Sequence, residues 1–232
     1  VEQGMDALVV ICVDSVGWTD QVLAAYNRIS VPLAYITTES LRHPLPHVFY
    51  DQYNAGYQAA RHLLDSGYRN LILFRPFTAA WAEERMAGAE AAVRQAGLAG
   101  ATVQVIPPAT DTEFHAFTNS KKLQQAALAQ IDWDAARANR GSVAIVAPND
   151  PQALLVREEL LKQELAPGAD VGLIGFDGDP QAAGFGLSTM VPPMEGLGEA
   201  AARLVAEVLS GEAAVTQIRL SSDLVARAST LR

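Results

Sequence analysis

The chain has 232 residues, of which 50% are hydrophobic and 19% are charged, so it can bury a substantial core and is not expected to be disordered. The formal net charge is −9, and no basic run is longer than Lys121-Lys122. Because neutralising phosphates requires a basic face, this segment is not expected to grip nucleic acid by itself.

Short apolar runs alternate with helical patterns along the chain, which is typical of parallel α/β folds. In chain order the sequence predicts a strand at 7–13, a helix at 20–29, a strand at 32–37, a helix at 54–64, a strand at 70–74, a helix at 79–95, a strand at 102–106, a helix at 123–131, a strand at 142–147, a helix at 151–165, a strand at 171–176, a helix at 194–209 and a strand at 217–220. The segment 132–140 is the least periodic, and we interpret it as an insertion.

Residues with strong positional preferences mark several helix ends. Gly67 and Gly97 follow helical patterns and are predicted to end them. Pro151 lies in the first turn of its helix, with Asn149 and Asp150 as caps. The helix at 194–209 has one apolar face, which by default packs in the core.

The sequence gives few signs of other chemistry or of export. Cys12 is the only cysteine, so it cannot form an internal disulfide, and it is predicted to be a buried small hydrophobe. No apolar stretch reaches the roughly 20 residues of a membrane span. The N-terminal residues do not resemble a signal peptide, so a cytoplasmic location is expected, although a mature secreted chain would also lack its signal. The histidines are not at metal-ligand spacing, so no metal or cofactor is expected.

Polar side chains follow the ends of predicted strands. Asp177 and Asn149 each come after a buried strand, and ligands of open α/β sheets bind beyond the carboxyl ends of strands. Arg85 lies in the first turns of the helix at 79–95, and the i, i+4 spacing puts Trp81 on the same helix face. An indole that stacks on a sugar ring, together with guanidinium, carboxamide and carboxylate groups that meet its hydroxyls, would suit a small polyol.

Each of these side chains also has a plainer interpretation. Trp81 could pack in the core, Arg85 could pair with Glu84 or Glu90 in solvent, Asn149 could only cap the helix after it, and Asp177 could be a hydrogen-bond acceptor within a loop. The residue pattern alone leaves these alternatives open.

Several short motifs, specific in their order and spacing, resemble the effector-binding region of lactose-repressor-type (LacI-type) transcription regulators. The matching runs are Gly4-Met-Asp-Ala-Leu-Val-Val10, Val31-Pro-Leu-Ala34, Asp51-Gln-Tyr-Asn-Ala-Gly56, Arg85-Met-Ala-Gly88, Asn149-Asp-Pro-Gln-Ala153, Gly175-Phe-Asp177 and Leu224-Val-Ala-Arg-Ala-Ser-Thr230. The resemblance implies a type I periplasmic-binding-protein-like fold, in which two doubly wound, parallel-sheet α/β subdomains enclose a ligand cleft.

The resemblance also implies the domain organisation and the site. Residues 1–50 and 191–211 would form the N-terminal subdomain, and residues 51–190 and 212–232 would form the C-terminal subdomain. The chain would cross between them near Tyr50, Val191 and Gly211. In the family, the residues that correspond to Arg85, Asn149 and Asp177 contact the effector; Trp81 is added from its place on the helix.

The chain departs from the family pattern in two ways. Gln52 replaces the usual asparagine, Phe185-Gly186 replaces a proline, and Pro192-Pro193 replaces Gln-Pro, but none of these is expected to touch the ligand groups directly. The matching part also begins near the end of the family's second core helix. We therefore expect an incomplete first subdomain and no DNA-binding helix-turn-helix in this chain.

Three functions compete at this level. The first is the effector-binding and dimerisation part of a homodimeric, ligand-responsive transcription regulator, which senses a sugar or a sugar derivative and contacts DNA through a headpiece outside this chain. The second is a sugar-binding protein of an ABC-type transporter, which shares the fold. The third is an enzyme, which the absence of common catalytic motifs disfavours.

Overall fold

The computed structural model describes residues 4–12, 25, 28–29, 31–38, 40–41, 45–108, 110, 112–211 and 217–231. These residues form two compact units, Val1–Asp51 with Pro193–Ser221 and Gln52–Pro192 with Ser222–Arg232. Both units are α/β, as predicted. The predicted helix at 20–29 lies almost entirely outside the described residues, and so does the side chain of Cys12.

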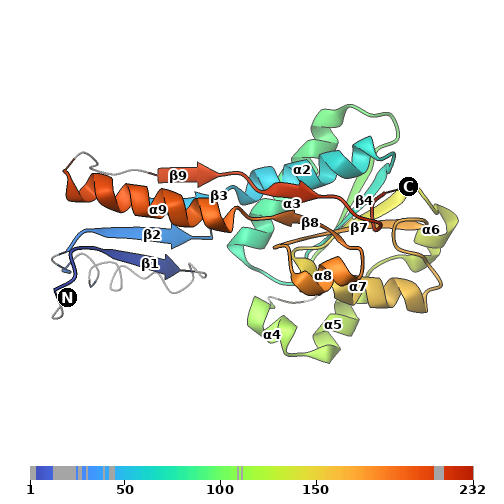
Figure 1. Ribbon diagram of the computed structural model, residues 1–232. Coiled ribbons are helices and arrows are strands. Elements are labelled where there is room, and N and C mark those ends of the chain that lie inside the picture. Colours follow the sequence, from blue (N-terminus) through green and yellow to red (C-terminus); the bar gives the residue numbers. More distant parts are fainter. Residues whose placement is uncertain are drawn as a thin grey trace. The chain divides into compact units, whose positions relative to one another are not determined.

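The second unit is built on a six-stranded sheet (Figure 1). In spatial order its strands are β10 (Asp223–Val225), β8 (Ser188–Val191), β7 (Val171–Phe176), β6 (Val143–Val146), β4 (Asn70–Phe74) and β5 (Thr102–Ile106). Only β10 is antiparallel to its neighbour. The carboxyl ends of the five parallel strands therefore meet at one edge of the sheet.

Helices cover both faces of this sheet. They are α2 (Gln52–Asp65), α3 (Ala80–Ala96), α4 (Phe114–Thr118), α5 (Lys121–Leu128), α6 (Trp133–Ala138), α7 (Asp150–Lys162) and α8 (Pro180–Gly184). Leu71 and Leu73 of β4 pack with α2 and α3, whereas Ile72 and Phe74 join the core under α5 and α7. A strand buried on both faces must be apolar at every position, which explains the continuous hydrophobic runs of the sequence.

The first unit has a parallel sheet in the order β1 (Leu8–Cys12), β2 (Leu33–Thr37), β3 (His47–Tyr50) and β9 (Gln217–Leu220). Helix α9 (Met194–Leu209) packs on this sheet, as predicted from its apolar face (Figure 1). Its buried residues Leu197, Ala201 and Leu204 contact Ala34 and Val48 of the strands. Burial of this apolar face therefore holds α9 on the sheet, as is usual for an amphipathic surface helix.

The third chain crossing was predicted at the wrong place. Residues 212–232 were assigned to the C-terminal subdomain, but β9 pairs in parallel with β3, so the first unit extends to Ser221. Sheet pairing decides which unit a strand belongs to, and the short run at 217–220 carries no local signal of its partner.

Several short elements were not predicted. These are β3, β8, β10, α4, α6 and α8, each of three to six residues. The segment interpreted as an insertion contains α6, which is capped by the Asp132 carboxylate accepting from the Ala135 N–H at 2.9 Å. Helix α7 ends at Lys162 rather than at 165, because Glu164 adopts a left-handed φ of 57°.

The closing segment is tied into the second unit by side-chain hydroxyls. Ser229 Oγ donates to Leu173 O at 2.6 Å and accepts from Ser188 N–H at 2.8 Å. Thr230 Oγ1 lies 2.6 Å from Ser188 Oγ and 2.7 Å from His62 Nε2 of α2. These bonds link the chain end to β7, β8 and α2, so the Ser-Thr pair of the closing motif has a structural role.

Candidate functional site

The candidate site lies at the carboxyl edge of the second unit's sheet. Asp177 follows β7, and Asn149 follows β6 and precedes α7. Arg85 and Trp81 lie in the first turns of α3, which follows β4. The topology therefore delivers all four predicted residues to one end of the sheet.

Arg85 is the centre of the site. Its side chain is only 2% exposed, and it donates three charge-assisted hydrogen bonds to three different segments. Nε donates to Gln52 Oε1 at 2.6 Å, Nη1 donates to Pro148 O at 2.7 Å, and Nη2 donates to Asp177 Oδ1 at 2.8 Å. A buried guanidinium is tolerated only with such compensation. The alternative that Arg85 lies in solvent is therefore wrong, because its side chain is buried.

Two aromatic rings contact the same guanidinium. Its carbon lies 4.9 Å from the centroid of Trp81 and 4.7 Å from that of Phe176. This confirms that Trp81 and Arg85 share one helix face. Trp81 also packs against Phe77 and Phe114, at centroid separations of 5.7 and 5.6 Å, so its packing role is confirmed as well. The cation–π contacts fix the plane of the guanidinium.

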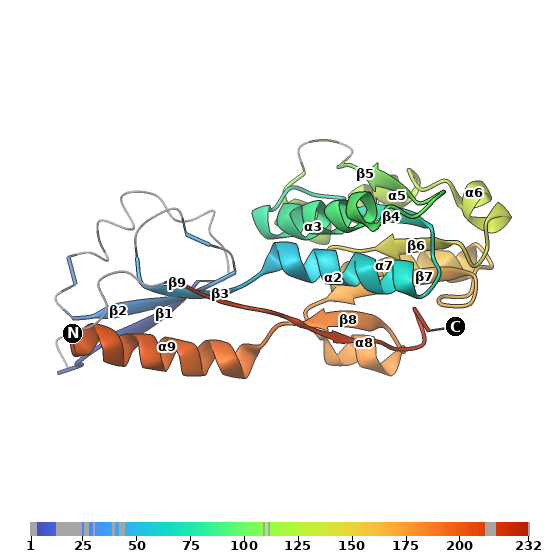
Figure 2. The ribbon, with the colours of Figure 1, turned by 90° about the horizontal axis from the view of Figure 1, so that it is seen from above.

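A close approach of α2 and α3 brings Gln52 to Arg85 (Figure 2). A Cβ at Gly56 would lie 1.8 Å from Arg85 O, and a Cβ at Gly88 would lie 1.9 Å from Tyr53 O. Only glycine allows the two backbones to come this near. The expectation that Gln52 does not touch the ligand groups is wrong, because Gln52 accepts directly from Arg85.

Asn149 caps α7, as predicted. Its Oδ1 accepts from the Gln152 N–H at 3.1 Å, and the residue is 5% exposed. The cap uses the carbonyl oxygen, so the amide NH₂ is a further donor beside Pro148, whose carbonyl oxygen accepts from Arg85. Capping and ligand contact are therefore compatible.

Asp177 is the most exposed member of the site, with 41% of its side chain accessible. Its backbone has a φ of 97°, a conformation that a non-glycine residue adopts only at a cost. Its N–H donates to Met190 O at 2.9 Å, and its carboxylate accepts from Arg85. Asp177 thus combines an internal ion pair with an accessible carboxylate.

Sequence reasoning missed three contributors to the site. Gln52 and Phe176 hold Arg85, and Asp150, predicted only as a cap, is a fully buried carboxyl group. Burial raises the pKa of Asp150 to about 6, against the lowering effect of hydrogen bonds from Asp179 N–H and the Thr189 hydroxyl, while the charges of Asp177 and Asp179 raise it further. The buried strand and helix start that flank Asp150 were visible in the sequence, but its burial was not.

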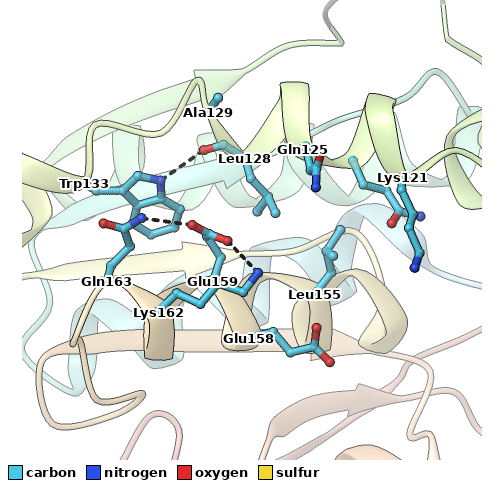
Figure 3. A pocket seen from close by; sticks show the side chains of 11 residues that line it. Lys121, Gln125, Leu128, Ala129, Trp133, Leu155, Glu158, Glu159, Lys162 and Gln163 are labelled. Carbon is cyan, nitrogen blue, oxygen red and sulfur yellow. Dashed lines mark hydrogen bonds and ion pairs between the residues drawn. The ribbon is translucent and has the colours of Figure 1, made fainter.

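A groove of about 640 Å³ lies elsewhere on the second unit (Figure 3). It is lined by residues of α5 and α7 and by Trp133, and it includes none of the four predicted site residues. Several of its polar side chains are already hydrogen-bonded within the protein (Figure 3). Glu159 accepts from Lys162 and Gln163, and Trp133 Nε1 donates to the backbone oxygen of Leu128. The groove is therefore distinct from the candidate site.

Two further findings, on metal binding and on membrane spanning, concern the part of the chain that the structure describes. Within it, no three His, Cys, Asp or Glu side chains are grouped so that they could hold a metal ion. None of its helices combines the length and the apolarity that crossing a membrane requires.

Comparison with known proteins identifies the family. The profile of the periplasmic binding protein-like domain matches residues 60–230. The chain belongs to this family. No curated protein sequence matches it significantly. The α/β architecture with mainly parallel sheets agrees with the periplasmic binding protein-like fold implied by the motifs.

Solved structures of this fold are similar to the chain. A LacI family transcriptional regulator from Enterococcus faecium with bound ribose superposes with a TM-score of 0.71 at 19% identity, over 99% of this chain and 81% of that chain. A periplasmic binding protein/LacI transcriptional regulator from Alkaliphilus metalliredigens complexed with D-xylulofuranose gives 0.68 at 19%, over 100% and 80%. The lac repressor dimer bound to operator gives 0.70 at 18%, over 100% and 66%. These likenesses establish the periplasmic binding protein-like fold of the chain.

Proposed function

We propose that this chain is the effector-binding part of a LacI-type, ligand-responsive transcription regulator that senses a sugar or a sugar derivative. The observation that carries the proposal is the buried Arg85, oriented by four side chains and a carbonyl and paired with the accessible carboxylate of Asp177. A pre-oriented guanidinium beside a carboxylate presents both donors and acceptors to vicinal hydroxyls. The sugars bound to the regulators of similar fold support the same ligand class.

The mechanism that we propose is a population shift. The effector would occupy the cleft between subdomains that the family resemblance implies, and it would bind one arrangement of the subdomains more tightly than another. Operator DNA would be contacted by a headpiece outside this chain, in a cytoplasmic homodimer without enzymatic activity. A sugar-binding protein of an ABC-type transporter is the alternative. An upstream helix-turn-helix in the full gene would favour the regulator, and an export signal would favour the transporter.

A thermal-shift screen with a library of sugars tests the binding function. A sugar present at about 100 times its dissociation constant should add about 2.7 kcal/mol to the free energy of unfolding. The substitutions Arg85→Ala and Asp177→Ala should each weaken its binding by about 1.5–3 kcal/mol, which is the scale of a charge-assisted hydrogen bond.

Arg157→Ala is the matched control for these variants. Arg157 also stacks on an aromatic ring in the second unit, with its guanidinium carbon 4.5 Å from the centroid of Phe185, but it lies outside the candidate site. Sugar affinity should be unchanged in this variant. Unchanged affinity in folded Arg85→Ala and Asp177→Ala would refute the site assignment, and turnover of the sugar would refute the non-enzymatic function.

The homodimer is tested separately. Sedimentation of the full-length protein should give a mass of two chains at micromolar concentration. A monomer that still binds operator DNA would contradict this part of the proposal and leave the sugar site unaffected.

A further inference from the structure

Asp150 is a charged residue with no exposed surface. It is the first residue of α7, and its relative exposure is 0%. Burying an ionisable carboxyl group is costly, and here it does not form an ion pair within the described residues. The presence of a buried carboxyl group at this position is therefore not explained by its contribution to stability.

The Asp150 carboxylate accepts two hydrogen bonds, one from the turn after β7 and one from strand β8. Its Oδ2 accepts from Asp179 N–H at 2.8 Å and from the Thr189 hydroxyl of β8 at 3.0 Å. The same hydroxyl oxygen accepts from Gly178 N–H at 3.2 Å. One carboxylate oxygen thereby fixes two successive amides of the turn after β7, one directly and one through Thr189.

The anchored turn has a strained conformation. Asp177 has a φ of 97°, and Gly178, which follows it, has a φ of 71°. A non-glycine residue persists in such a conformation only when surrounding contacts hold it there. The two anchored amides come directly after Asp177, so they determine where its carboxylate points.

The second carboxylate oxygen of Asp150 accepts no hydrogen bond from any residue that the structure describes. It lies over Gly175 of β7, where a Cβ would be 2.2 Å from Oδ1. Gly175 therefore leaves the space that this buried carboxylate occupies. An unsatisfied buried acceptor destabilises the fold, which again favours a functional role for the group.

We propose that Asp150 is a positioning residue of the candidate site, whose carboxylate holds the turn at 177–179 so that Asp177 meets Arg85. As a role in effector binding, the inference rests on the proposed function. The geometry it predicts can be measured without any ligand. Asp150 forms no hydrogen bond with Asp177 or Arg85 among the described contacts, but its charge acts on Asp177. Asp150→Asn, which is also uncharged, therefore separates an effect carried by the turn from an effect of the charge.

The test compares four variants of the full chain with the natural sequence. Asp150→Ala removes the acceptor, Thr189→Val removes the bridge to Gly178, and Asp150→Asn keeps an acceptor oxygen in place. Asp170→Ala is the control, because the Asp170 carboxylate also accepts a backbone N–H, that of Ala166 at 2.8 Å, in another loop of the second unit. Amide hydrogen exchange and the NMR signal of the Arg85 guanidinium are measured without ligand.

In Asp150→Ala the Gly178 and Asp179 amides should exchange about tenfold faster, and in Thr189→Val the Gly178 amide should do so. In both variants the Arg85 signal should shift, while protection in the sheet stays unchanged. Asp150→Asn should restore both toward the natural values. Asp170→Ala should change only its own loop and its ion-pair partner Arg140, and it should leave the turn at 177–179 unchanged. Natural exchange at Gly178 and Asp179 and an unshifted Arg85 signal in Asp150→Ala would overturn the proposal. If that variant does not fold, the same result in Thr189→Val decides.

The outcome separates the two proposals. If the turn responds but the sugar screen finds no ligand, Asp150 positions the Arg85–Asp177 pair and the proposed ligand class fails. If a sugar binds through Arg85 and Asp177 while substitution of Asp150 leaves the turn unchanged, the positioning role fails and the proposed function stands.

Discussion

At the scale of single residues, Arg85 shows how a cation is kept in a protein interior and yet made available. Three acceptors and two rings surround its guanidinium, and one of the acceptors, Asp177, has an accessible side chain. The charge is therefore compensated before any ligand arrives. Under the proposed function, a ligand hydroxyl would take over the contact with Asp177 without leaving the guanidinium unpaired.

Replacing Gln52 should show how much its hydrogen bond to the buried Arg85 contributes to stability. Gln52→Leu preserves much of the volume but removes the acceptor of Arg85 Nε, which stays buried. A buried donor without its partner costs about 1–3 kcal/mol, so the free energy of unfolding in urea should fall by that amount. Gln58→Leu, at a half-buried position of the same helix, should change it by less than about 0.5 kcal/mol. Equal effects of the two substitutions would contradict this account of Arg85.

At the scale of elements, the crossing of α2 and α3 sets the position of Arg85. The two helices approach at Gly56 and Gly88, and the backbone contacts there leave no room for a side chain. The glycine and the arginine of the Arg-x-x-Gly motif therefore act together. The glycine allows α2 to lie close to α3, and α2 carries Gln52, which accepts a hydrogen bond from the arginine.

Gly88→Ala should accordingly destabilise the protein. The new Cβ would overlap Tyr53 O, so the helices must separate, at a cost of about 1–3 kcal/mol. Gly184→Ala is the control, because its Cβ would meet no atom within 4 Å, and alanine favours the helical conformation. Thermal unfolding should show a lower midpoint for the first variant and an equal or higher midpoint for the second. A tolerated Gly88→Ala would mean that the helices can move apart freely.

The elements that could be predicted from sequence are those with strong local signals. The buried strands β4 and β7 and the long helix α9 were predicted at their observed bounds, because apolar runs and stripes mark burial directly. Short elements such as β10 (Asp-Leu-Val) and α8 (Pro-Gln-Ala-Ala-Gly) were not predicted, since neither contains an apolar run or a helical stripe. The placement of β9 failed because pairing with β3 is a property of the sheet and not of the strand.

The candidate site, like the fold, could be predicted only where the sequence carries local signals. Strand ends identified Asp177 and Asn149, and helical spacing joined Trp81 to Arg85, because both signals are local. The contact from Gln52 to Arg85 depends on how two helices cross, and the burial of Asp150 depends on a turn after another strand. No local pattern encodes either one.

At the scale of the whole molecule, the buried carboxyl of Asp150 couples stability to pH. Burial is the main cause that raises its pKa from 3.8 to about 6 in the folded state. Between these values the folded state retains a proton that the unfolded state has released. The contribution of Asp150 to stability is therefore most favourable below pH 3.8, declines as the pH rises toward 6, and is constant above that.

The substitution Asp150→Asn isolates this contribution. Asparagine keeps an acceptor oxygen and does not ionise, so the variant lacks the cost of burying a charge. A shift from 3.8 to about 6 corresponds to about 2–3 kcal/mol, and the stability of the variant relative to the natural protein should rise by this amount between about pH 4 and pH 7. Urea unfolding of both proteins across this range measures the difference. His62, whose pKa is lowered by burial, titrates in both proteins and cancels. A difference that stays constant with pH would mean that the pKa of Asp150 is the same in the folded and unfolded states. A difference that falls would mean that the folded state favours the ionised carboxylate.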